Sequence, residues 1–371
     1  MKDNYMTGLV IADIHIGAVD TKHLEKELND VFIEKVKELG KELDFVEIAG
    51  DLFHSQINMN SDNGKLANKF ILTLNDLSME NDFELRLLKG TASHDLNQLS
   101  VFERLMVTNP KFKIINTLTE DTFNSNGHTL NVLQIPEEYI NDVEGYYREA
   151  FSKKYDMVFS HGTYDFAGYI SSHQDGERTL KHAPTFKAKD VKKVSNGPVL
   201  SGHVHKRMDN DGVYYVGSFS RFSYGEEESK GFYMVTINTE DSTDFTLDFI
   251  ENDMAETYVT VDLNDIDTDK VEDMGNYIKT LKSTYDNIRI KSNKSLDNEL
   301  EIKLLKELSE SDKSIKIDVK KNIQAATVDE KYQFILKGEY DLPHTIQKFI
   351  KIKYNEDVTL KDIKNILTEN F

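Results

Sequence analysis

Aspartate and histidine recur where apolar segments of this chain end, and this recurrence constrains the fold more than any other feature of the sequence. The stretch GLVIADIHIG, residues 8–17, stops being apolar at Asp13 and His15. Because residues i and i+2 of a strand point to the same side, we expect both side chains to project together beyond the carboxyl end of a strand. Taken alone, the pattern also fits a turn aspartate followed by a surface histidine.

Four further apolar segments end in the same way. They are IAGDLFH with Asp51 and His54, LLKGTASHD with Ser93, His94 and Asp95, VFSHG with His161, and LSGHVHKR with His203 and His205. Ligands of open α/β sheets bind beyond the carboxyl ends of the strands. The five segments therefore predict one polar site along that edge.

The residue types at these segment ends indicate a metal site. Imidazole and carboxylate together suit borderline divalent cations such as manganese, iron and zinc, and burying so many of them without a cation would be costly. Two ions about 3.5–4 Å apart can hold a phosphate and activate a water. Asp51 is the candidate for a carboxylate shared by both ions, because Gly50 before it lets the backbone approach closely.

The part of the chain up to residue 252 has an α/β pattern. Predicted strands cover 6–13, 45–51, 83–90, 130–136, 155–162, 197–203 and 213–218, and several are continuous apolar runs typical of strands covered on both faces. One amphipathic helix is predicted over 21–40, with Gly40 as its C-cap, and a second around 66–77. The segments 231–238 and 245–252 follow each other without a helix and predict an antiparallel hairpin.

The pattern changes after residue 252. Residues 256–320 predict a small second domain, with strands over 257–263, 287–292 and 314–320 and helices near 267–284 and 296–309. Residues 342–371 predict two short amphipathic helices, whose apolar residues are Ile346, Phe349 and Ile350 in one and Leu360, Ile363, Ile366 and Leu367 in the other. We therefore expect three parts, over 1–252, 253–325 and 326–371.

Charge and composition exclude several classes of protein. The 371 residues contain no cysteine, which rules out disulfides and cysteine-bound zinc and fits a reducing, cytoplasmic environment. No apolar run approaches the roughly 20 residues needed to span a bilayer, and the amino terminus lacks the layout of a signal peptide. With a net charge of −20, the chain is a poor general binder of nucleic acid, so any contact with DNA needs a local basic surface, a metal site or a partner.

The order of the five motifs resembles that of the calcineurin-like metallophosphoesterases. The series D-x-H, G-D-x-x-H, H-D, H-G and G-H-x-H is that family's order, and the form GDLFH together with YVGSFSRFSYGEEESKGF, residues 215–232, is similar to its SbcD branch. That branch comprises nuclease subunits of double-strand-break repair complexes and their bacteriophage recombination-endonuclease relatives. The resemblance covers about residues 6–252, while 256–320 match the family's capping domain in position and pattern. It implies a layered calcineurin-like α/β sandwich with a small α+β capping domain and C-terminal helices.

Carried over residue by residue, the resemblance implies two divalent cations, Mn²⁺ foremost, with Mg²⁺, Fe²⁺ or Zn²⁺ as alternatives. The first ion would be held by Asp13, His15, Asp51 and His205, and the second by Asp51, Ser93, His161 and His203. His94 would act as general acid or phosphate stabiliser, Asp95 would orient its ring, and His54 would line the pocket.

One motif departs from the family. The usual G-N-H-D places an asparagine amide on the second ion, whereas here the loop from Gly90 to Asp95 reads GTASHD and is longer. Ser93 takes the place of the asparagine, and either its hydroxyl, a weaker ligand, or a water would fill the coordination position.

The resemblance implies a manganese-dependent DNA exonuclease and endonuclease subunit. It further implies gating by an SMC-like ATPase of the SbcC type, bound through the C-terminal helices, and a homodimer in the cytoplasm, that of a bacterial host if the gene belongs to a phage. Lysines of residues 181–194, with Lys206, Arg207 and Arg221, form either a phosphate-contacting surface or an ordinary solvated face.

Two alternatives stay open. One is a phosphatase of the same fold for small phosphoesters or phosphoproteins, although protein phosphatases of this fold usually have an arginine where His54-Ser55 stands. The other is a non-catalytic subunit that bridges DNA ends. The missing asparagine is compatible with this alternative.

Overall fold

The computed structural model describes residues 4–167, 184–262, 271–292, 312, 314–319, 346–347, 350–351, 357–361 and 363. The chain divides into two compact units, Met1–Thr260 with Tyr277–Arg289, and Val261–Asn276 with Ile290–Phe371. The expected three-part division at 252 and 325 stays a prediction.

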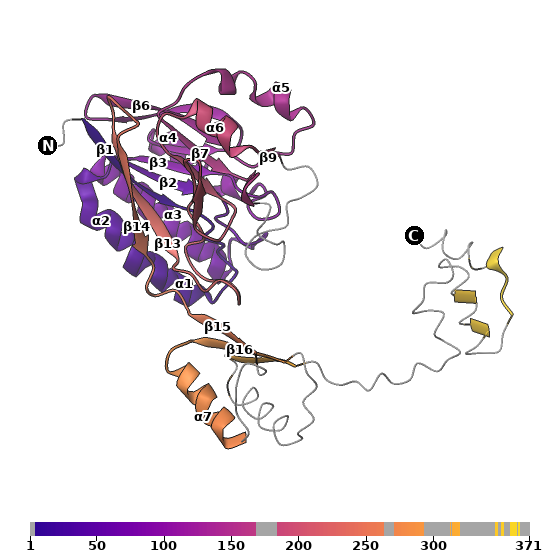
Figure 1. The fold of residues 1–371 in the computed structure, drawn as a ribbon. Helices are drawn as coiled ribbons and strands as arrows, with labels where there is room; N and C mark the ends of the chain where they lie inside the picture. Colours follow the sequence, from indigo (N-terminus) through magenta and orange to yellow (C-terminus); the bar gives the residue numbers. More distant parts are fainter. Residues whose placement is uncertain are drawn as a thin grey trace. The chain divides into compact units, whose positions relative to one another are not determined.

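The first sheet of the larger unit has six strands in the order β14-β13-β1-β2-β3-β4 (Figure 1). Its members are β1 (Tyr5–Ile11), β2 (Phe45–Ala49), β3 (Glu84–Leu88), β4 (Phe112–Ile115), β13 (Gly231–Asn238) and β14 (Phe245–Glu251). β1 to β4 are parallel, while β13 pairs antiparallel with both β1 and β14. The predicted hairpin over 231–252 is thus confirmed, and it forms one side of the sheet.

The second sheet also has six strands, in the order β11-β12-β10-β7-β6-β5. Its members are β5 (Thr119–Ser125), β6 (His128–Ile135), β7 (Met157–His161), β10 (Val199–Gly202), β11 (Met208–Asn210) and β12 (Val213–Tyr215). β6, β7, β10 and β12 run parallel. A separate parallel pair, β8 (Thr163–Tyr164) and β9 (Thr185–Phe186), follows the end of β7.

One continuous helical segment connects β1 to β2. It consists of α1 (Thr21–Glu27), a π-helical turn η1 (Leu28–Ile33) and α2 (Glu34–Leu39), and then the short η2 (Gly40–Glu42). Gly40 ends α2 with a left-handed φ of 49°, which confirms its predicted role as C-cap. The π turn was not predicted, because the spacing of Leu24, Leu28, Phe32 and Val36 fits a regular helix as well.

The second predicted helix is α3 (Asp62–Asn81), longer at both ends than expected and capped by the Ser61 hydroxyl. The other helices that the structure describes before residue 260 are short. They are η3 (Gln98–Phe102), α4 (Leu105–Thr108), α5 (Val143–Tyr147), η4 (Ala150–Ser152) and α6 (Ala188–Val194).

Three apolar cores define the layers of this unit. One lies between the two sheets and includes Val10, Phe45, Phe159 and Leu200. A second packs the first sheet against the helical segment and α3, as with Leu24, Phe32 and Phe70, and a third packs the second sheet against α5 and α6, as with Tyr147 and Val191. The larger unit is therefore an α/β sandwich of two mixed sheets covered by helices (Figure 1).

A small three-stranded sheet follows in the order β15-β16-β17. It comprises β15 (Tyr258–Asp262), β16 (Asn287–Ser292) and β17 (Ile315–Val319), with α7 (Val271–Lys282) between the first two strands. These elements confirm four of the predicted elements, and the predicted helix over 296–309 lies outside the described residues. In the tail, Ile346, Ile350, Leu360 and Ile363 are helical, and Phe349, Ile366 and Leu367 lie outside the described residues.

Candidate metal centre

Asp13 and His15 lie beyond the first strand rather than in it, because β1 ends at Ile11. The two residues have left-handed φ angles of 49° and 48°, and Asp51 and His203 share this conformation at 52° and 92°. The expectation that the alternation of a strand aims Asp13 and His15 together is therefore wrong. Their loop turns them to the site instead, and such strained backbone in non-glycine residues is typical of functional sites.

Six of the predicted residues come together at the carboxyl ends of the parallel strands. We call Asp13, His15, Asp51, His161, His203 and His205 the strand-end cluster. Ligand atoms of Asp13, His15 and His205 lie within 4.8 Å of one another, and so do those of Asp51, His161 and His203. The strand-end cluster thus forms two groups of three side chains, each able to hold a metal ion.

In the first group, Nε2 of His15 lies 2.9 Å from Nε2 of His205. The Nδ1 atom of His15 is buried without a hydrogen-bond partner among the described residues. The carboxylate of Asp13 accepts a hydrogen bond from the backbone N–H of His203 at 3.0 Å, which connects this group to the second.

In the second group, Nε2 of His161 lies 3.1 Å from Oδ2 of Asp51. The Nδ1 atom of His161 donates to the backbone carbonyl of Ala49 at 2.9 Å. A ligating histidine is commonly oriented in this way, with its other nitrogen held by a carbonyl. The arrangement aims Nε2 of His161 into the cluster.

Asp51 belongs to the second group and also lies next to the first. Its Oδ2 atom, 3.1 Å from His161, lies 3.8 Å from Nε2 of His15. A Cβ at Gly50 would overlap the ring of His161, and one at Gly90 would overlap the carboxylate and backbone nitrogen of Asp51. The close approach expected of Gly50 is therefore present, and Gly90 makes a second one.

Burial and mutual attraction set the charges of the strand-end cluster. Burial lowers the pKa of His15 well below its usual range and that of His203 to about 3, so both rings are neutral and retain a lone pair. Burial opposes charge on His161 and Asp51 as well, but their attraction outweighs it and raises the pKa of His161 while lowering that of Asp51. Burial raises the pKa of Asp13.

His94 and His54 lie beside the first group. The ring centroid of His94 is 4.8 Å from that of His15 and 5.5 Å from that of His54, and these three histidines form a further potential ligand set. The Nδ1 atom of His94 donates to the backbone carbonyl of His54. His94 is buried, whereas His54 is exposed.

Asp95 has a different role from the one that the resemblance implied. Its Oδ2 atom accepts hydrogen bonds from the backbone N–H of Gly90 at 2.7 Å and of Asp51 at 3.2 Å, and Oδ1 accepts from Phe53 at 3.1 Å. The carboxylate therefore fixes the loops that carry Asp51 and Gly90, while the carbonyl of His54 orients the ring of His94.

Ser93 does not join the strand-end cluster. It is exposed, whereas Thr91, two residues earlier, is buried. The Thr91 hydroxyl lies 3.2 Å from Oδ2 of Asp51, 3.3 Å from Nε2 of His161 and 3.4 Å from Nδ1 of His203. Thr91 follows Gly90 directly and so remains next to the end of β3, whereas the longer loop carries Ser93 outward.

The sequence did not single out two buried glutamates beside the site. Glu137 follows β6, and its Oε2 lies 3.4 Å from Nδ1 of His203. Glu226 has Oε1 3.5 Å from Nδ1 of His205 and Oε2 3.0 Å from the buried Lys230 ammonium. Burial would raise the pKa of Glu226, but His205 and Lys230 hold it at about 2, so a carboxylate orients His205.

The donor set fits metal binding. It combines imidazole and carboxylate groups and is almost entirely buried. The Nδ1 atom of His15 has no hydrogen-bond partner among the described residues, and the Nε2 atoms of His15 and His205 face each other, as the nitrogens of two histidines on one metal ion do. The structure thus supports metal binding at the strand-end cluster.

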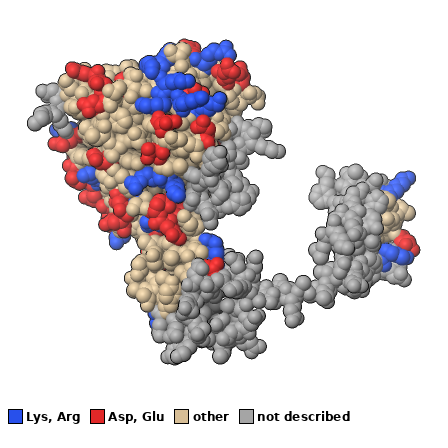
Figure 2. Space-filling model, viewed as in Figure 1, with Lys and Arg blue, Asp and Glu red and all other residues tan. Residues whose placement is uncertain are grey.

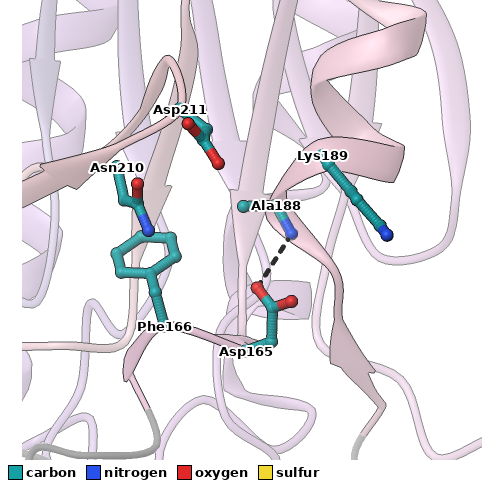
Figure 3. Close-up of a pocket in the computed structure, with 6 residues that line it drawn as sticks. All are labelled: Asp165, Phe166, Ala188, Lys189, Asn210 and Asp211. Atoms are coloured by element: carbon teal, nitrogen blue, oxygen red, sulfur yellow. Dashed lines mark hydrogen bonds between the residues drawn. The ribbon is translucent and has the colours of Figure 1, made fainter.

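A separate surface pocket of about 200 Å³ lies at the start of α6 (Figure 3). It is lined by Asp165, Phe166, Ala188, Lys189, Asn210 and Asp211, and Asp165 Oδ1 accepts a hydrogen bond from the backbone N–H of Ala188 at 3.1 Å. None of these residues belongs to the strand-end cluster, so the pocket is a distinct feature.

The predicted basic residues divide into two sets. Lys192 donates to the carbonyl of Gly197 at 2.6 Å, and Arg221 donates to the carbonyl of Ala255 at 3.0 Å, so both have structural roles. Lys187, Lys189 and Lys193 are exposed. Figure 2 shows Lys and Arg side chains gathered over α6.

No helix among the described residues combines the length and the apolar character that a membrane span requires. Comparison with known proteins gives no further guide to the chain: no protein-family model matches it, and a search of curated proteins finds no relative.

Proposed function

We propose that this protein is a two-cation phosphodiesterase that cleaves DNA, a manganese-dependent nuclease subunit of a double-strand-break repair or recombination complex. The observation that carries the proposal is the position of Asp51, whose Oδ2 atom lies 3.8 Å from His15 of one ligand group and 3.1 Å from His161 of the other. One carboxylate between two ligand groups is the arrangement that paired cations require.

Two divalent cations at such a site supply an activated water near neutral pH and stabilise charge on a phosphate. The protein's own contribution includes His94. Because its Nδ1 donates to the carbonyl of His54, the ring is held beside His15 of the first ligand group, where the substrate would bind. There it can hold a proton at the leaving oxygen or donate a hydrogen bond to the phosphate. Exposed His54 lies beside His94 and would contact the substrate as well.

Exposed lysines near the site support DNA as the substrate. β9 pairs with β8, which begins two residues after His161, and Lys187 follows β9 directly. Lys187 is therefore joined through this strand pair to the end of β7, whereas Lys189 lines the surface pocket with Asn210 and Asp211, which precede β12. A local basic surface of this kind is what an acidic chain needs in order to hold a phosphate backbone.

We also propose the two protein partners that the resemblance implies. An SMC-like ATPase would bind the C-terminal helices and gate access of DNA to the site. A homodimer is supported by apolar side chains on the surface of α3 and α4, where Leu72, Met79 and Val107 are 45%, 51% and 85% exposed. Asn109 donates to Asn75 at 3.2 Å, which brings the end of α4 next to this face of α3.

The test of the proposed function is cleavage of a labelled linear duplex and of single-stranded DNA by the purified full chain with Mn²⁺. We expect cutting that stops in EDTA. His94→Ser should abolish cutting while the protein still binds Mn²⁺ with unchanged stoichiometry in isothermal titration calorimetry.

The alternatives give different results in the same assays. Hydrolysis of mononucleotide esters without any cutting of DNA would favour a phosphatase. Binding of DNA without cleavage, with or without an ATPase partner, would favour a subunit that only bridges DNA ends.

A further inference from the structure

Glu137 lies against the second ligand group although no motif of the sequence includes it. It follows β6 in the segment IPEEY, and its side chain is buried with 3% exposure. Its Oε2 atom is 3.4 Å from Nδ1 of His203 and 3.4 Å from the hydroxyl of Thr91. A carboxylate is thus present where a neutral ligand was expected.

Four side-chain atoms that could bind a metal ion lie at nearly equal distances from the Thr91 hydroxyl. Asp51 Oδ2 is 3.2 Å away, His161 Nε2 3.3 Å, His203 Nδ1 3.4 Å and Glu137 Oε2 3.4 Å. When metal–ligand distances are about 2.0–2.2 Å, two ligand atoms on the same divalent cation lie about 3 Å or slightly more apart. The distances from Thr91 to these four atoms therefore match those between ligands of one ion. Three of the four atoms already belong to the second group.

We propose that Glu137 is a ligand of the second cation, together with Asp51, His161 and His203, and that Thr91 supplies the neutral oxygen beside them. This inference rests on the proposed two-cation site and extends its ligand set. It assigns the second cation two carboxylates instead of the one carboxylate and the Ser93 hydroxyl that the resemblance implied.

The neighbours of Glu137 favour a ligand over a purely structural side chain. Its Oε1 accepts from the hydroxyl of Tyr139 at 3.3 Å, which leaves Oε2 directed at the cluster. The adjacent Glu138 is different, since it accepts hydrogen bonds from the backbone N–H of Leu118 at 2.8 Å and from the hydroxyl of Tyr146 at 2.9 Å. Of the two consecutive glutamates, one therefore fixes the loop and the other faces the metal site.

An added carboxylate changes which ions the site prefers. Carboxylate oxygens suit hard cations such as Mn²⁺ and Mg²⁺, whereas a set richer in imidazole suits Zn²⁺. We therefore expect Glu137 to contribute more to binding of Mn²⁺ at the second position than to binding of Zn²⁺.

The experiment is a titration of the full-length protein with Mn²⁺ alone, by calorimetry and by electron paramagnetic resonance of free Mn²⁺. Wild type should bind two ions. Glu137→Gln should bind the second ion at least about tenfold more weakly and leave the first unchanged, as expected when a ligand charge is removed. Glu138→Gln is the matched control and should behave as wild type.

The outcomes separate this inference from the function it rests on. Two ions bound equally well by wild type and Glu137→Gln would overturn the role of Glu137 alone. Wild type that binds no pair of ions would overturn the two-cation site and this inference with it. If Glu137→Gln does not fold by circular dichroism, Glu137→Asp replaces it, because the shorter carboxylate should also weaken the second ion, and equal binding would again contradict the proposal.

Discussion

Nε2 of His15 and Nε2 of His205 lie 2.9 Å apart across 190 residues of sequence. Two imidazole nitrogens can approach so closely only when a proton lies between them or when both turn to a shared cation. His15 follows β1 of the first sheet and His205 follows β10 of the second, and the hydrogen bond from the His203 backbone to Asp13 shows that these two strand ends lie side by side. The contact therefore shows that motifs far apart in the sequence meet at one site in the fold.

Cation binding should release protons and strengthen as the pH rises. Attraction to Asp51 outweighs the effect of burial and raises the pKa of His161, so without metal this ring carries a proton at neutral pH. A cation needs the neutral ring, and the proton must leave when the ion binds. We expect the Mn²⁺ affinity to be lower at pH 6 than at pH 8, as measured by calorimetry.

Calorimetry in buffers of different ionisation enthalpy gives the number of protons released. His161→Asn should release about one proton fewer than wild type, because its amide has no proton to lose. Equal affinities at both pH values would contradict a charged His161 in the metal-free protein.

Gly90→Ala should disrupt the site more than its small size suggests. A Cβ at Gly90 would overlap Oδ1, Cγ and the backbone nitrogen of Asp51, so this carboxylate, which the proposed function places between two cations, has to move. We expect loss of both cations in a Mn²⁺ titration and a lower melting temperature. Gly127→Ala is the control, because a Cβ there meets nothing within 4 Å although its φ of 82° makes the alanine strained. It should lose stability but retain both cations.

The sequence predicted the sheets better than the exact ends of their strands. β1 ends at Ile11 instead of Asp13, and β2 ends at Ala49 instead of Asp51. The apolar pattern continues in the sequence to the edge of the sheet and so predicts a strand that far. Residues that turn toward the site must leave the hydrogen-bonded strand, and here they do so with left-handed backbone angles. Local pattern contains no signal for that change.

The site was predictable where a motif specified spacing and unpredictable where tertiary structure decided. Aspartate and histidine at the segment ends were sufficient to find the strand-end cluster. Thr91 and Ser93 offer the same hydroxyl, and only the path of the loop buries the first and exposes the second. Glu137 and Glu138 are likewise identical in type, and the contacts made after folding distinguish them.

Charge reversal at the start of α6 should weaken binding of DNA. The double variant Lys187→Glu with Lys189→Glu removes two exposed positive charges and adds two negative ones. We expect affinity for a duplex to fall and its dependence on log salt concentration to become shallower, since each lost phosphate contact lowers the slope by about 0.9.

Fluorescence anisotropy with Ca²⁺ in place of Mn²⁺ measures this binding without the proposed cleavage. The double variant Lys37→Glu with Lys65→Glu is the matched control, because these lysines are 50% and 70% exposed on α2 and α3 and pair only with their helix neighbours Glu34 and Asp62 among the described residues. An equal loss for the control variant would show a general effect of net charge and not a surface at α6.

Glu47→Gln should stabilise the protein at pH 8 and change little at pH 5. Glu47 is fully buried in β2 and accepts a hydrogen bond from the amide of Gln134 in β6 at 2.9 Å, across the core between the two sheets. Burial raises its pKa from 4.5 to about 8. Between these values the folded state binds more protons than the unfolded state, so the free energy of unfolding falls as the pH rises, by on the order of a few kcal/mol.

The substitution removes this dependence because glutamine does not ionise. It also supplies an amide that can donate to Oε1 of Gln134, which has no hydrogen-bond partner among the described residues. Urea unfolding in EDTA at both pH values measures the effect, and the difference from wild type should grow with pH. Exposed Glu240→Gln serves as control, with a difference that stays constant. An advantage of Glu47→Gln that is the same at pH 5 and pH 8 would mean that Glu47 is already ionised between the sheets at pH 5.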